Sequence, residues 1–461
     1  MAESKATFAS RVGVIAATVG SAVGLGNIWR FPSVVQSSGG SAFLVVYLVC
    51  VLALGIPVML AEFSLGRAGR SDSVGSFKNL SPGKGWWVLG TFGLIASYLI
   101  LPFYLVVAGW SAEYLWESIS GSIFEGLAAG GDSAANSAVF TTHMNDLISS
   151  PTRPIFWIYL MIILNLVVLL RGVRKGIERL SNVLMPLLFV LLIVFCVVSL
   201  TLPGAGAGVE FFLKPDFSKI NSSVVLNALG QAFFSLSLGM GILVTYASYF
   251  PRNTMMTRTA VTVSVCDFAV AVLMGLIIFP AVTSFGMSDS GLEGTTLVFV
   301  TLPGVFTQMA GARIWAILFF LLLFVATLTS SVSIAEVPIA FLRDRLRMRR
   351  RSACLWVLLP MFIFSAICSL SLGAVPSLKI LGLSVFDFLD TITANLLLPL
   401  SAIGVCIYVG WVMHRKFLRD ELTNYGTFPS WAAPIAQVLI KTVCPLLIAV
   451  ILVSQLIALL R

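Results

Sequence analysis

Two glycine-containing stretches interrupt apolar runs of the sequence, and both carry polar residues that could bind ions. The first, residues 20–32, reads GSAVGLGNIWRFP, and the second, residues 230–241, reads GQAFFSLSLGMG. A break in a helix frees backbone amides, which can hold an anion, and carbonyls, which can hold a hard cation such as sodium. A single glycine pair in a membrane helix more commonly serves close packing. Because two breaks stand in corresponding places with polar residues beside both, we favour a binding site built from both.

The breaks lie in a chain that is apolar over most of its length. Hydrophobic residues make up 58% of its 461 residues and charged residues 11%, too little charge to cover the surface of a soluble protein. The apolar segments are long enough to cross a bilayer as helices and lack the alternation of barrel strands. We therefore predict an all-α polytopic membrane protein with eleven transmembrane helices, near residues 11–37, 41–66, 87–117, 154–171, 180–201, 227–250, 257–284, 313–342, 353–371, 384–412 and 430–458. The glycine-rich residues 204–208 are expected to form a loop.

Lysine and arginine are concentrated in alternate connections between these helices. The connection after the eighth predicted helix is the most basic, with arginine at positions 343, 345, 347 and 349–351. Because cytoplasmic loops carry the excess of positive charge, we expect a cytoplasmic N-terminus and an extracytoplasmic C-terminus. The net charge of +9 then reflects topology and attraction to anionic lipids, and we expect no nucleic-acid partner.

The two interrupted motifs, together with LTSS at residues 328–331, resemble the neurotransmitter:sodium symporter family, in its bacterial amino-acid branch with eleven helices. The resemblance covers essentially the whole chain, and the bacterial branch implies a place in the plasma membrane, the inner membrane of a bacterium. The family resemblance implies the leucine-transporter fold, in which two inverted five-helix repeats each begin with a broken helix, here helices 1 and 6. The expected division is a first repeat at 1–201, an extracellular connection at 202–226, a second repeat at 227–412, and a cytoplasmic loop with helix 11 at 413–461.

The resemblance also implies two sodium sites made of oxygen donors. The first consists of Ala22, Asn27, Ser235 and Asp267, completed by the carboxylate of a bound amino acid. The second consists of Gly20, Val23, Ala326, Thr329 and Ser330. Taken alone, the hydroxyls of Thr329 and Ser330 would more commonly bond back to carbonyls of their own helix. Because these hydroxyls occur together with the first break, we prefer the interpretation that they bind an ion.

A substrate site follows from the same resemblance. Its expected residues are Ala22, Leu25, Gly26, Ile100, Tyr104, Phe234, Ser235, Ser237, Met240, Ser330 and Ile334. The amides of Leu25 and Gly26 and the hydroxyl of Tyr104 would meet the substrate carboxylate, although a membrane tyrosine alone is more often an interfacial anchor. The side-chain pocket is mostly apolar and offers no counter-charge. We therefore expect a hydrophobic L-amino acid, aliphatic or aromatic, as substrate.

Charged residues inside membrane helices are costly, so each needs a reason. Arg30 and Asp390 match the family's extracellular gate, and Lys5 and Asp344 match its intracellular gate. The family usually has arginine and then tryptophan where this chain has Lys5 and Phe8. Lysine cannot make the two-point contact of arginine, so this departure would loosen the inward seal.

Two further features complete the expected machinery. Gly176 and Pro186 frame nine residues and resemble the family motif at which helix 5 unwinds to admit water to the second sodium. Glu62 and Glu336 are expected to be structural hydrogen-bond hubs without a transport role.

Asp267 bears on charge balance. Animal members of the family usually have asparagine at this position and serine four residues later, an arrangement that helps to bind chloride. Here the position is Asp267 itself, followed by Ala271. One fixed carboxylate offsets half the charge of two sodium ions, so we expect no chloride requirement, with proton antiport through a protonated Asp267 as the accompanying hypothesis. The alternative for Asp267 is a purely structural hydrogen-bond acceptor.

The favoured hypothesis is therefore a symporter that couples two sodium ions to a hydrophobic L-amino acid by alternating access. A proton-coupled transporter or exchanger of the same architecture is the alternative, but a lysine would then be expected in place of the second-site hydroxyls. A receptor or an enzyme would need a soluble module or a buried catalytic cluster. Neither is apparent, so we expect no enzyme. The expected partners are the substrate and the lipid bilayer, and the oligomeric state is left open.

Overall fold

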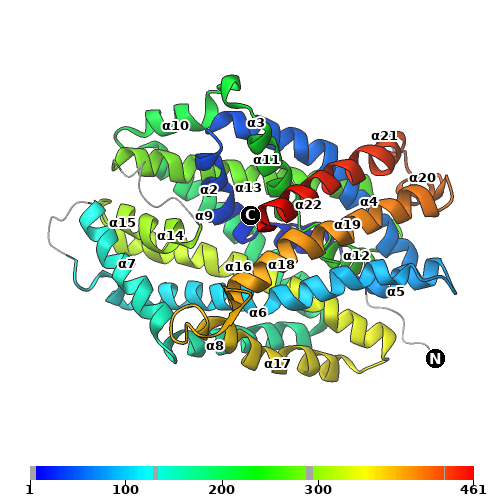
Figure 1. Ribbon diagram of the computed structural model, residues 1–461, viewed down its shortest axis with the longest axis horizontal. Coiled ribbons are helices and arrows are strands. Elements are labelled where there is room, and N and C mark those ends of the chain that lie inside the picture. The colour runs from blue at the N-terminus through cyan, green and yellow to red at the C-terminus, as the bar shows by residue number, and fades with distance from the viewer. Residues whose placement is uncertain (1–6, 128–132, 287–293, 430, 461) are drawn as a thin grey trace.

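The computed structural model describes residues 7–127, 133–286, 294–429 and 431–460. In these ranges long helices run roughly side by side through one bundle (Figure 1). Among the described residues the only strands are β1 (Lys379–Ile380) and β2 (Leu383–Ser384), which form a short antiparallel hairpin with Lys379 opposite Ser384. The predicted all-α membrane fold is confirmed.

The helices follow one another with few long connections. The first half of the chain contains α1 (Arg11–Ala22), η1 (Gly26–Arg30), α2 (Phe31–Ser37), α3 (Ser41–Cys50), η2 (Val51–Gly55), α4 (Ile56–Gly69), α5 (Ser73–Leu80), α6 (Trp87–Ser120), η3 (Ser122–Phe124), α7 (Ser133–Ser149), α8 (Arg153–Leu170), η4 (Val173–Glu178), α9 (Arg179–Leu200), α10 (Ala205–Leu213) and η5 (Phe217–Lys219). The second half contains α11 (Ser222–Ser235), α12 (Ile242–Ala247), α13 (Met256–Ser284), α14 (Gly294–Thr296), η6 (Leu297–Thr301), α15 (Leu302–Phe306), α16 (Ala312–Arg345), α17 (Arg350–Leu370), α18 (Val385–Ile392), η7 (Thr393–Leu397), α19 (Leu398–Ile407), η8 (Tyr408–Val412), α20 (Phe417–Leu422), α21 (Ala432–Val438), η9 (Leu439–Val443) and α22 (Cys444–Leu460).

The membrane-crossing elements match the predicted spans closely. In the described part of the chain, nine helices are long and apolar enough to cross a membrane, and the bent pair Arg11–Ala22 and Gly26–Ser37 makes a tenth. The remaining predicted span, 227–250, is divided between α11 and α12, each too short to cross alone. Both spans that the sequence marks as broken are therefore interrupted in the structure.

One local expectation was wrong. The glycine-rich residues 204–208, expected to form a loop, begin the helix α10 at Ala205. Glycine is needed there for packing, because a Cβ atom on Gly208 would overlap the backbone of Phe279 and Pro280 in α13. Gly208 therefore marks a close contact between two helices, whereas Gly204, with a φ of 89°, lies in the turn that precedes α10.

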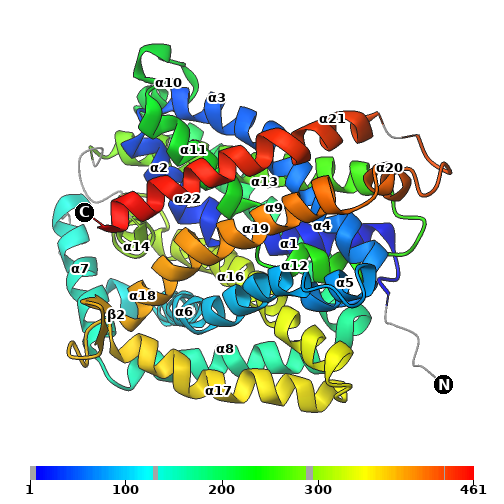
Figure 2. The ribbon, with the colours of Figure 1, turned by 45° about the vertical axis from the view of Figure 1, so that its right-hand side comes forward.

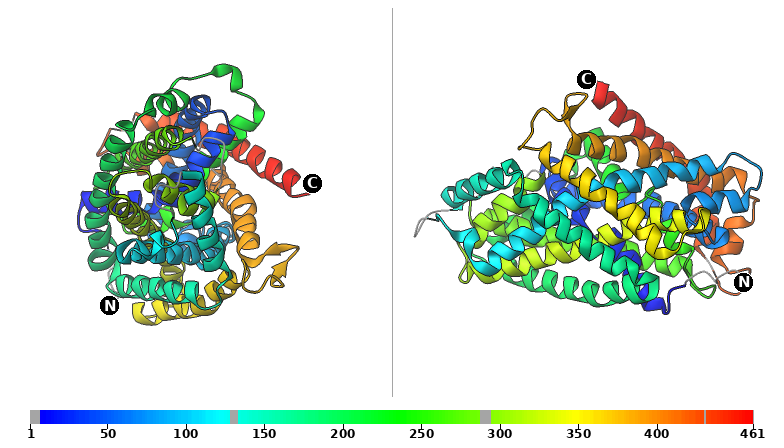
Figure 3. Two further views of the ribbon diagram at one scale, coloured as in Figure 1. Left: turned by 90° about the vertical axis from the view of Figure 1, so that its left-hand side faces the viewer. Right: turned by 90° about the horizontal axis from the view of Figure 1, so that it is seen from below.

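Connections of the same predicted side gather at the same end of the bundle. α5 and α20 lie together at one end, and α7 and α10 lie at the other (Figures 1 and 2). α5 and α20 belong to connections predicted to be cytoplasmic, while α7 and α10 belong to connections predicted to be extracytoplasmic. α22 lies at the outside of the bundle, where it packs against α19 (Figures 2 and 3).

The two longest helices form the centre of the bundle. α6 and α16 contain 34 residues each and pack along one another. Their most apolar windows are 72% and 78% buried, against 28% for the last helix. Polar groups on α6 and α16 are therefore held away from lipid and can face one another.

The second break depends on glycine geometry. Between α11 and α12 the backbone has positive φ at Ser237 (54°), Gly239 (77°) and Gly241 (72°), a region that side chains disfavour. The amide of Gly239 donates a hydrogen bond of 2.7 Å to Oε1 of buried Glu62 in α4. A Cβ atom on Gly239 would also overlap the carbonyl oxygen of Leu398.

We therefore expect Gly239→Ala to destabilise the protein. The backbone conformation alone would cost about 1–2 kcal/mol, and the overlap with Leu398 adds to it. Gly230→Ala is the matched control, because Gly230 lies inside α11 with open space around its Cβ position. It should leave stability unchanged or raise it by about 1 kcal/mol or less. Thermal unfolding of the purified variants in detergent measures both, and equal melting temperatures would contradict this account of the break.

Candidate functional site

Three buried polar side chains from three helices meet where the first break faces the second. Asn27 lies in η1, Ser235 is the last residue of α11, and Asp267 lies in α13, each at most 1% exposed. Asn27 Nδ2 donates to Ser235 Oγ at 3.0 Å and to Asp267 Oδ1 at 2.9 Å. Ser235 Oγ donates to Asp267 Oδ2 at 2.7 Å, and the Tyr47 hydroxyl donates to the same oxygen at 3.3 Å. A single carboxylate thus lies at the centre of an oxygen-rich cluster.

A second polar cluster joins the first helix to α16. Ser330 Oγ lies 3.2 Å from the carbonyl oxygens of both Gly20 and Val23, to which it donates across the helix interface. Thr329 Oγ1 instead lies 3.1 Å from the carbonyls of Val325 and Ala326 in its own helix. The two neighbouring hydroxyls therefore behave differently: Thr329 makes the back-bond that such residues commonly make, and Ser330 does not.

The carbonyls at this point are available because α1 ends there. α1 stops at Ala22, and the next helical residue is Gly26, with a bend of 54° between the two segments. The last four carbonyls of a helix have no partner within it, so they must be satisfied from elsewhere. Ser330 supplies that partner for Gly20 and Val23.

Gly24 lies against α6 and α16 with almost no spare room. A Cβ atom there would lie 2.8 Å from Ser330 Oγ and 3.0 Å from the Tyr104 hydroxyl. The Tyr104 hydroxyl faces Ser330 and the Leu25 backbone, yet it is buried without a hydrogen-bond partner among the described residues. Such a group costs free energy unless a ligand satisfies it.

A cavity of about 220 Å³ opens beside this tyrosine. It is lined by Leu25, Trp29, Arg30, Phe103, Tyr104, Val107, Phe234, Phe386, Asp390, Thr391, Ala394 and Asn395. The Arg30 guanidinium lies 4.5 Å from the centre of the Phe234 ring, in a cation–π contact. Arg30 and Asp390 both line the cavity, but within the described structure their side chains do not form an ion pair within 4.0 Å. The cavity thus connects the predicted substrate residues with the predicted outer gate.

The other predicted pocket residues are buried but do not line this cavity. They are Ile100, Ser237, Met240, Ser330 and Ile334, each 3–6% exposed. Ser237 Oγ donates to the carbonyl of Ser21 at 2.9 Å and so ties the two breaks to each other. Gly26 packs against Phe234, whose ring would lie 3.1 Å from a Cβ atom at that position.

At the opposite end, the predicted inner gate is described only in part. Lys5 lies outside the described residues, and Asp344 lies in the last turn of α16. Phe8, which stands where the family usually has tryptophan, is buried against the rings of Tyr246 and Tyr249, with centroids 5.9 and 6.3 Å away. Its amide donates to the Tyr249 carbonyl at 3.0 Å. An aromatic contact therefore fills this position.

The segment between Gly176 and Pro186 is helical, within η4 and α9. Ser181 and Met185 of this segment would lie 3.5 and 3.4 Å from a Cβ atom on Gly20, so α9 covers the first helix at the second polar cluster. The Glu178 carboxylate accepts hydrogen bonds from the amides of Ala9 and Ser10 and holds the start of the first helix onto the same segment.

Several residues that shape the site were not predicted to do so. Gln231 Nε2 donates to the Gly26 carbonyl at 2.9 Å, and Tyr47 contacts Asp267. Gln231 stands four residues before Ser235, on the same face of α11, so helical spacing could have indicated it. No comparable spacing points to Tyr47, which lies on α3.

Of the two carboxylates expected to be hydrogen-bond hubs, Glu336 makes several bonds, whereas Glu62 makes one and its Oε2 is buried without a partner among the described residues. Glu336 accepts from the Tyr249 hydroxyl at 2.9 Å and from both terminal nitrogens of Arg350 at 3.0 and 2.7 Å. Glu62 accepts from the Gly239 amide. Each carboxylate joins its helix to another part of the chain.

Comparisons with known proteins agree with this arrangement. The model of the sodium:neurotransmitter symporter family matches residues 5–124 and 137–460. An uncharacterized sodium-dependent transporter of Haemophilus influenzae is 38% identical over 98% of both chains. The uncharacterized sodium-dependent transporter YhdH of Bacillus subtilis is 35% identical over 90% of both. The structure of MhsT in complex with L-phenylalanine matches with a TM-score of 0.87 and 40% identity, over 98% of this chain and all of that one.

These matches settle the class of protein. The relatives are transporters and not enzymes, and they are named for their dependence on sodium. The expectation of a multi-pass membrane transporter is confirmed, and so is the leucine-transporter fold. The chain is a member of the sodium:neurotransmitter symporter family.

Proposed function

We propose that this chain couples the movement of sodium to that of a hydrophobic L-amino acid by alternating access, without chloride. The observation that carries the proposal is the cluster of Asn27, Ser235 and Asp267 at the meeting point of the two breaks. Its donors are carboxylate, amide and hydroxyl oxygens, which suit a hard cation. The similarity to MhsT, whose structure contains L-phenylalanine, supports a hydrophobic substrate.

In this proposal the first sodium is held by Ala22, Asn27, Ser235 and Asp267. The hydrogen bonds among Asn27, Ser235 and Asp267 keep the three side chains together, and rotation of the Asn27 amide would present its oxygen to the ion. The carboxylate of the amino acid would complete the coordination. Sodium and substrate would then share a ligand, so each would raise the affinity for the other by the same factor.

The second sodium would be held by Gly20, Val23, Ala326, Thr329 and Ser330. The support is that Ser330 already spans from α16 to the carbonyls of Gly20 and Val23, across the interface that must close around an ion. Sodium between these oxygens would replace the hydroxyl hydrogen as the group that satisfies the two carbonyls. Binding would thereby hold the first helix against α16.

The substrate would lie between Tyr104 and the second break. Its carboxylate would meet the amides of Leu25 and Gly26, at the positive end of a half-helix, and the unpartnered hydroxyl of Tyr104. Its side chain would lie among apolar groups from α6, α16 and the second break: Ile100, Phe234, Met240 and Ile334. Because these side chains offer no charged partner, a lysine or glutamate substrate would be desolvated without compensation.

Alternating access would use the groups around this site. Arg30 and Asp390 would close the cavity above Phe234 on the outside, and Lys5 with Asp344 would close the inner end. α9 covers the first helix near Gly20, so unwinding between Gly176 and Pro186 would open a path for the second sodium. In this scheme the two repeats, 1–201 and 227–412, enclose the site in a bacterial inner membrane with the N-terminus inside.

Substrate binding should require sodium. We expect labelled leucine and phenylalanine to bind the purified protein in sodium chloride and to bind at least about fivefold more weakly in potassium chloride, since coupling energies of this kind correspond to about 5- to 150-fold. Unlabelled lysine and glutamate should not compete. Scintillation-proximity binding measures both effects, and equal binding in the two salts would rule out the symporter.

Ser330→Ala should weaken the response to sodium. We expect the half-saturating sodium concentration for uptake into proteoliposomes to rise about tenfold or more, because an interaction with a charged partner is typically worth 1.5–3 kcal/mol. The matched control is Ser331→Ala, one residue away on α16, whose hydroxyl donates only to Leu328 of its own helix at 3.1 Å. If both variants shift the sodium dependence equally, the second ion binds elsewhere.

Transport should not depend on chloride. Unit charges about 4 Å apart interact by about 4 kcal/mol at an effective dielectric constant of 20, so the Asp267 carboxylate can stabilise bound cations substantially. Uptake by the wild type should be unchanged when gluconate replaces chloride, and Asp267→Asn should lose most of it. Asp267→Asn combined with Ala271→Ser should regain uptake only when chloride is present. Chloride-dependent uptake by the wild type, or normal chloride-free uptake by Asp267→Asn, would show that another group balances the charge.

A further inference from the structure

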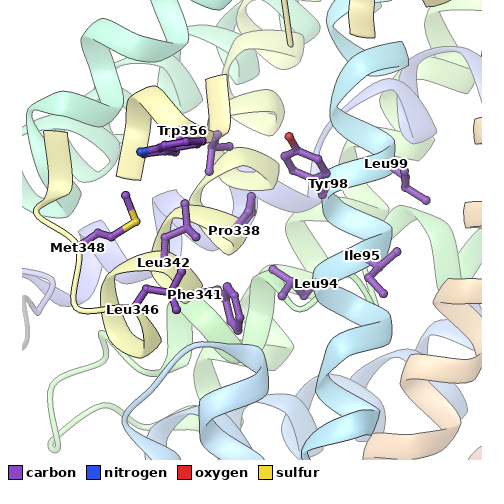
Figure 4. A pocket seen from close by; sticks show the side chains of 11 residues that line it. Leu94, Ile95, Tyr98, Leu99, Pro338, Phe341, Leu342, Leu346, Met348 and Trp356 are labelled. Carbon is purple, nitrogen blue, oxygen red and sulfur yellow. The ribbon is translucent and has the colours of Figure 1, made fainter. Parts of the chain in front are cut away.

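A second, larger hollow lies away from the proposed transport site, between three helices at the end of the bundle where α6 begins. It measures about 620 Å³ and is lined by parts of α6, α16 and α17 and by the connection between α16 and α17. Leu94 and Tyr98 on α6 face Pro338, Leu342 and Trp356 across it (Figure 4). Apart from Tyr98 and Trp356, no lining side chain carries a nitrogen or oxygen atom. We call this hollow the α6–α17 groove.

The groove is exposed and its lining is suited to lipid. Leu346 and Trp356 are 60% and 68% exposed at its edge. Tryptophan and tyrosine are enriched where a membrane meets water, and the α16–α17 connection that borders the groove lies just there, between two predicted spans. Apolar side chains this exposed are expected to be covered by lipid tails.

Positive charge lies at the rim of the same groove. Arg347 and Arg349 flank Met348, which lines the groove, and both arginines are exposed. In the part of the chain that the structure describes, neither side chain forms an ion pair. Arg349 is the N-cap residue of α17, the helix whose Trp356 also lines the groove.

The neighbouring Arg350 fixes this arrangement. Its guanidinium bonds to both carboxylate oxygens of Glu336 and to the Leu169 carbonyl. Because Arg350 is anchored inward to buried Glu336, the connection is held in place and its neighbours are left facing outward. The two free cations are thus presented at a defined position beside the apolar groove.

We propose that the α6–α17 groove binds an anionic phospholipid of the surrounding bilayer. One acyl chain lies against Leu94, Pro338 and Leu342, and the phosphate headgroup meets Arg347 and Arg349. A second copy of the chain would account for the apolar lining but not for the unpaired cations at its rim. Clusters of arginine beside a membrane helix attract anionic headgroups, and here the cluster adjoins an apolar groove that can bind the acyl chain.

This lipid would contact the two central helices directly. α6 also carries Tyr104, and α16 also carries Ser330, at positions nearer the middle of the membrane. An occupied groove would therefore brace these helices against α17. The proposal does not depend on the identity of the transported substrate.

Native mass spectrometry of the full-length protein, delipidated in detergent and titrated with lipid, tests the proposal. Phosphatidylglycerol and phosphatidylcholine with the same acyl chains are the probes. We expect the wild type to bind phosphatidylglycerol about tenfold more tightly than phosphatidylcholine. R347Q/R349Q should lose this preference. R415Q/K416Q removes two exposed cations from the connection before α20, outside the groove, and should retain it.

A second pair of variants tests whether the acyl chain binds in the groove. Leu94→Trp fills the groove and should weaken binding of both lipids, whereas Ile363→Trp, at an exposed position of α17 outside the groove, should not. Equal affinity for the two lipids in the wild type would overturn the proposal, as would an unchanged preference in R347Q/R349Q. Undiminished lipid binding by Leu94→Trp would show that the acyl chain does not bind in the groove, and would overturn the proposal. A dimer that Leu94→Trp dissociates would assign the groove to a second copy instead.

Discussion

An interrupted helix inside a membrane leaves backbone groups that no water can satisfy, and the centre of this protein is arranged around that constraint. At the first break Ser330 meets the carbonyls of Gly20 and Val23, and Gln231 meets that of Gly26. At the second, Glu62 meets the amide of Gly239. The partners come from α16, α11 and α4, so the breaks themselves determine which helices must pack together.

The same constraint underlies the proposed second sodium site. A hydroxyl that satisfies two carbonyls can be replaced in that role by a cation, because both present positive charge to the oxygens. Ser330 is placed for such an exchange, whereas Thr329 bonds to its own helix and holds no carbonyl of the first helix. A site built from backbone carbonyls and hydroxyls can thus remain satisfied with or without an ion, which a reversible carrier requires.

The architecture could be predicted from the sequence because its signals are local and long. Spans of apolar residues define the membrane helices, and glycines with polar neighbours mark both breaks, so ten of the eleven predicted spans coincide with helices or a bent pair of sufficient length. The glycine-rich residues 204–208 were misread, because close packing of Gly208 on α13 and a turn look the same in sequence. Contacts such as Tyr47 with Asp267 could not be found, since 220 residues separate them and no spacing links α3 to α13.

Buried charge follows a second rule that sequence alone does not reveal. Glu336 lies opposite Arg350, and Arg67 bonds to Glu421 at 2.9 Å, so these charges at the end of the bundle near α5 and α20 are neutralised in pairs. Asp267 differs, because its three side-chain partners, Asn27, Ser235 and Tyr47, are all neutral. A carboxylate whose hydrogen-bond donors are all neutral retains its negative charge for a cation, whereas the charge of a carboxylate paired with arginine is already neutralised. Among the described residues Glu62 also lacks a cationic partner, but its carboxylate bonds to the Gly239 amide and supports the second break, whereas the neutral partners of Asp267 include the other proposed side-chain ligands of the first sodium.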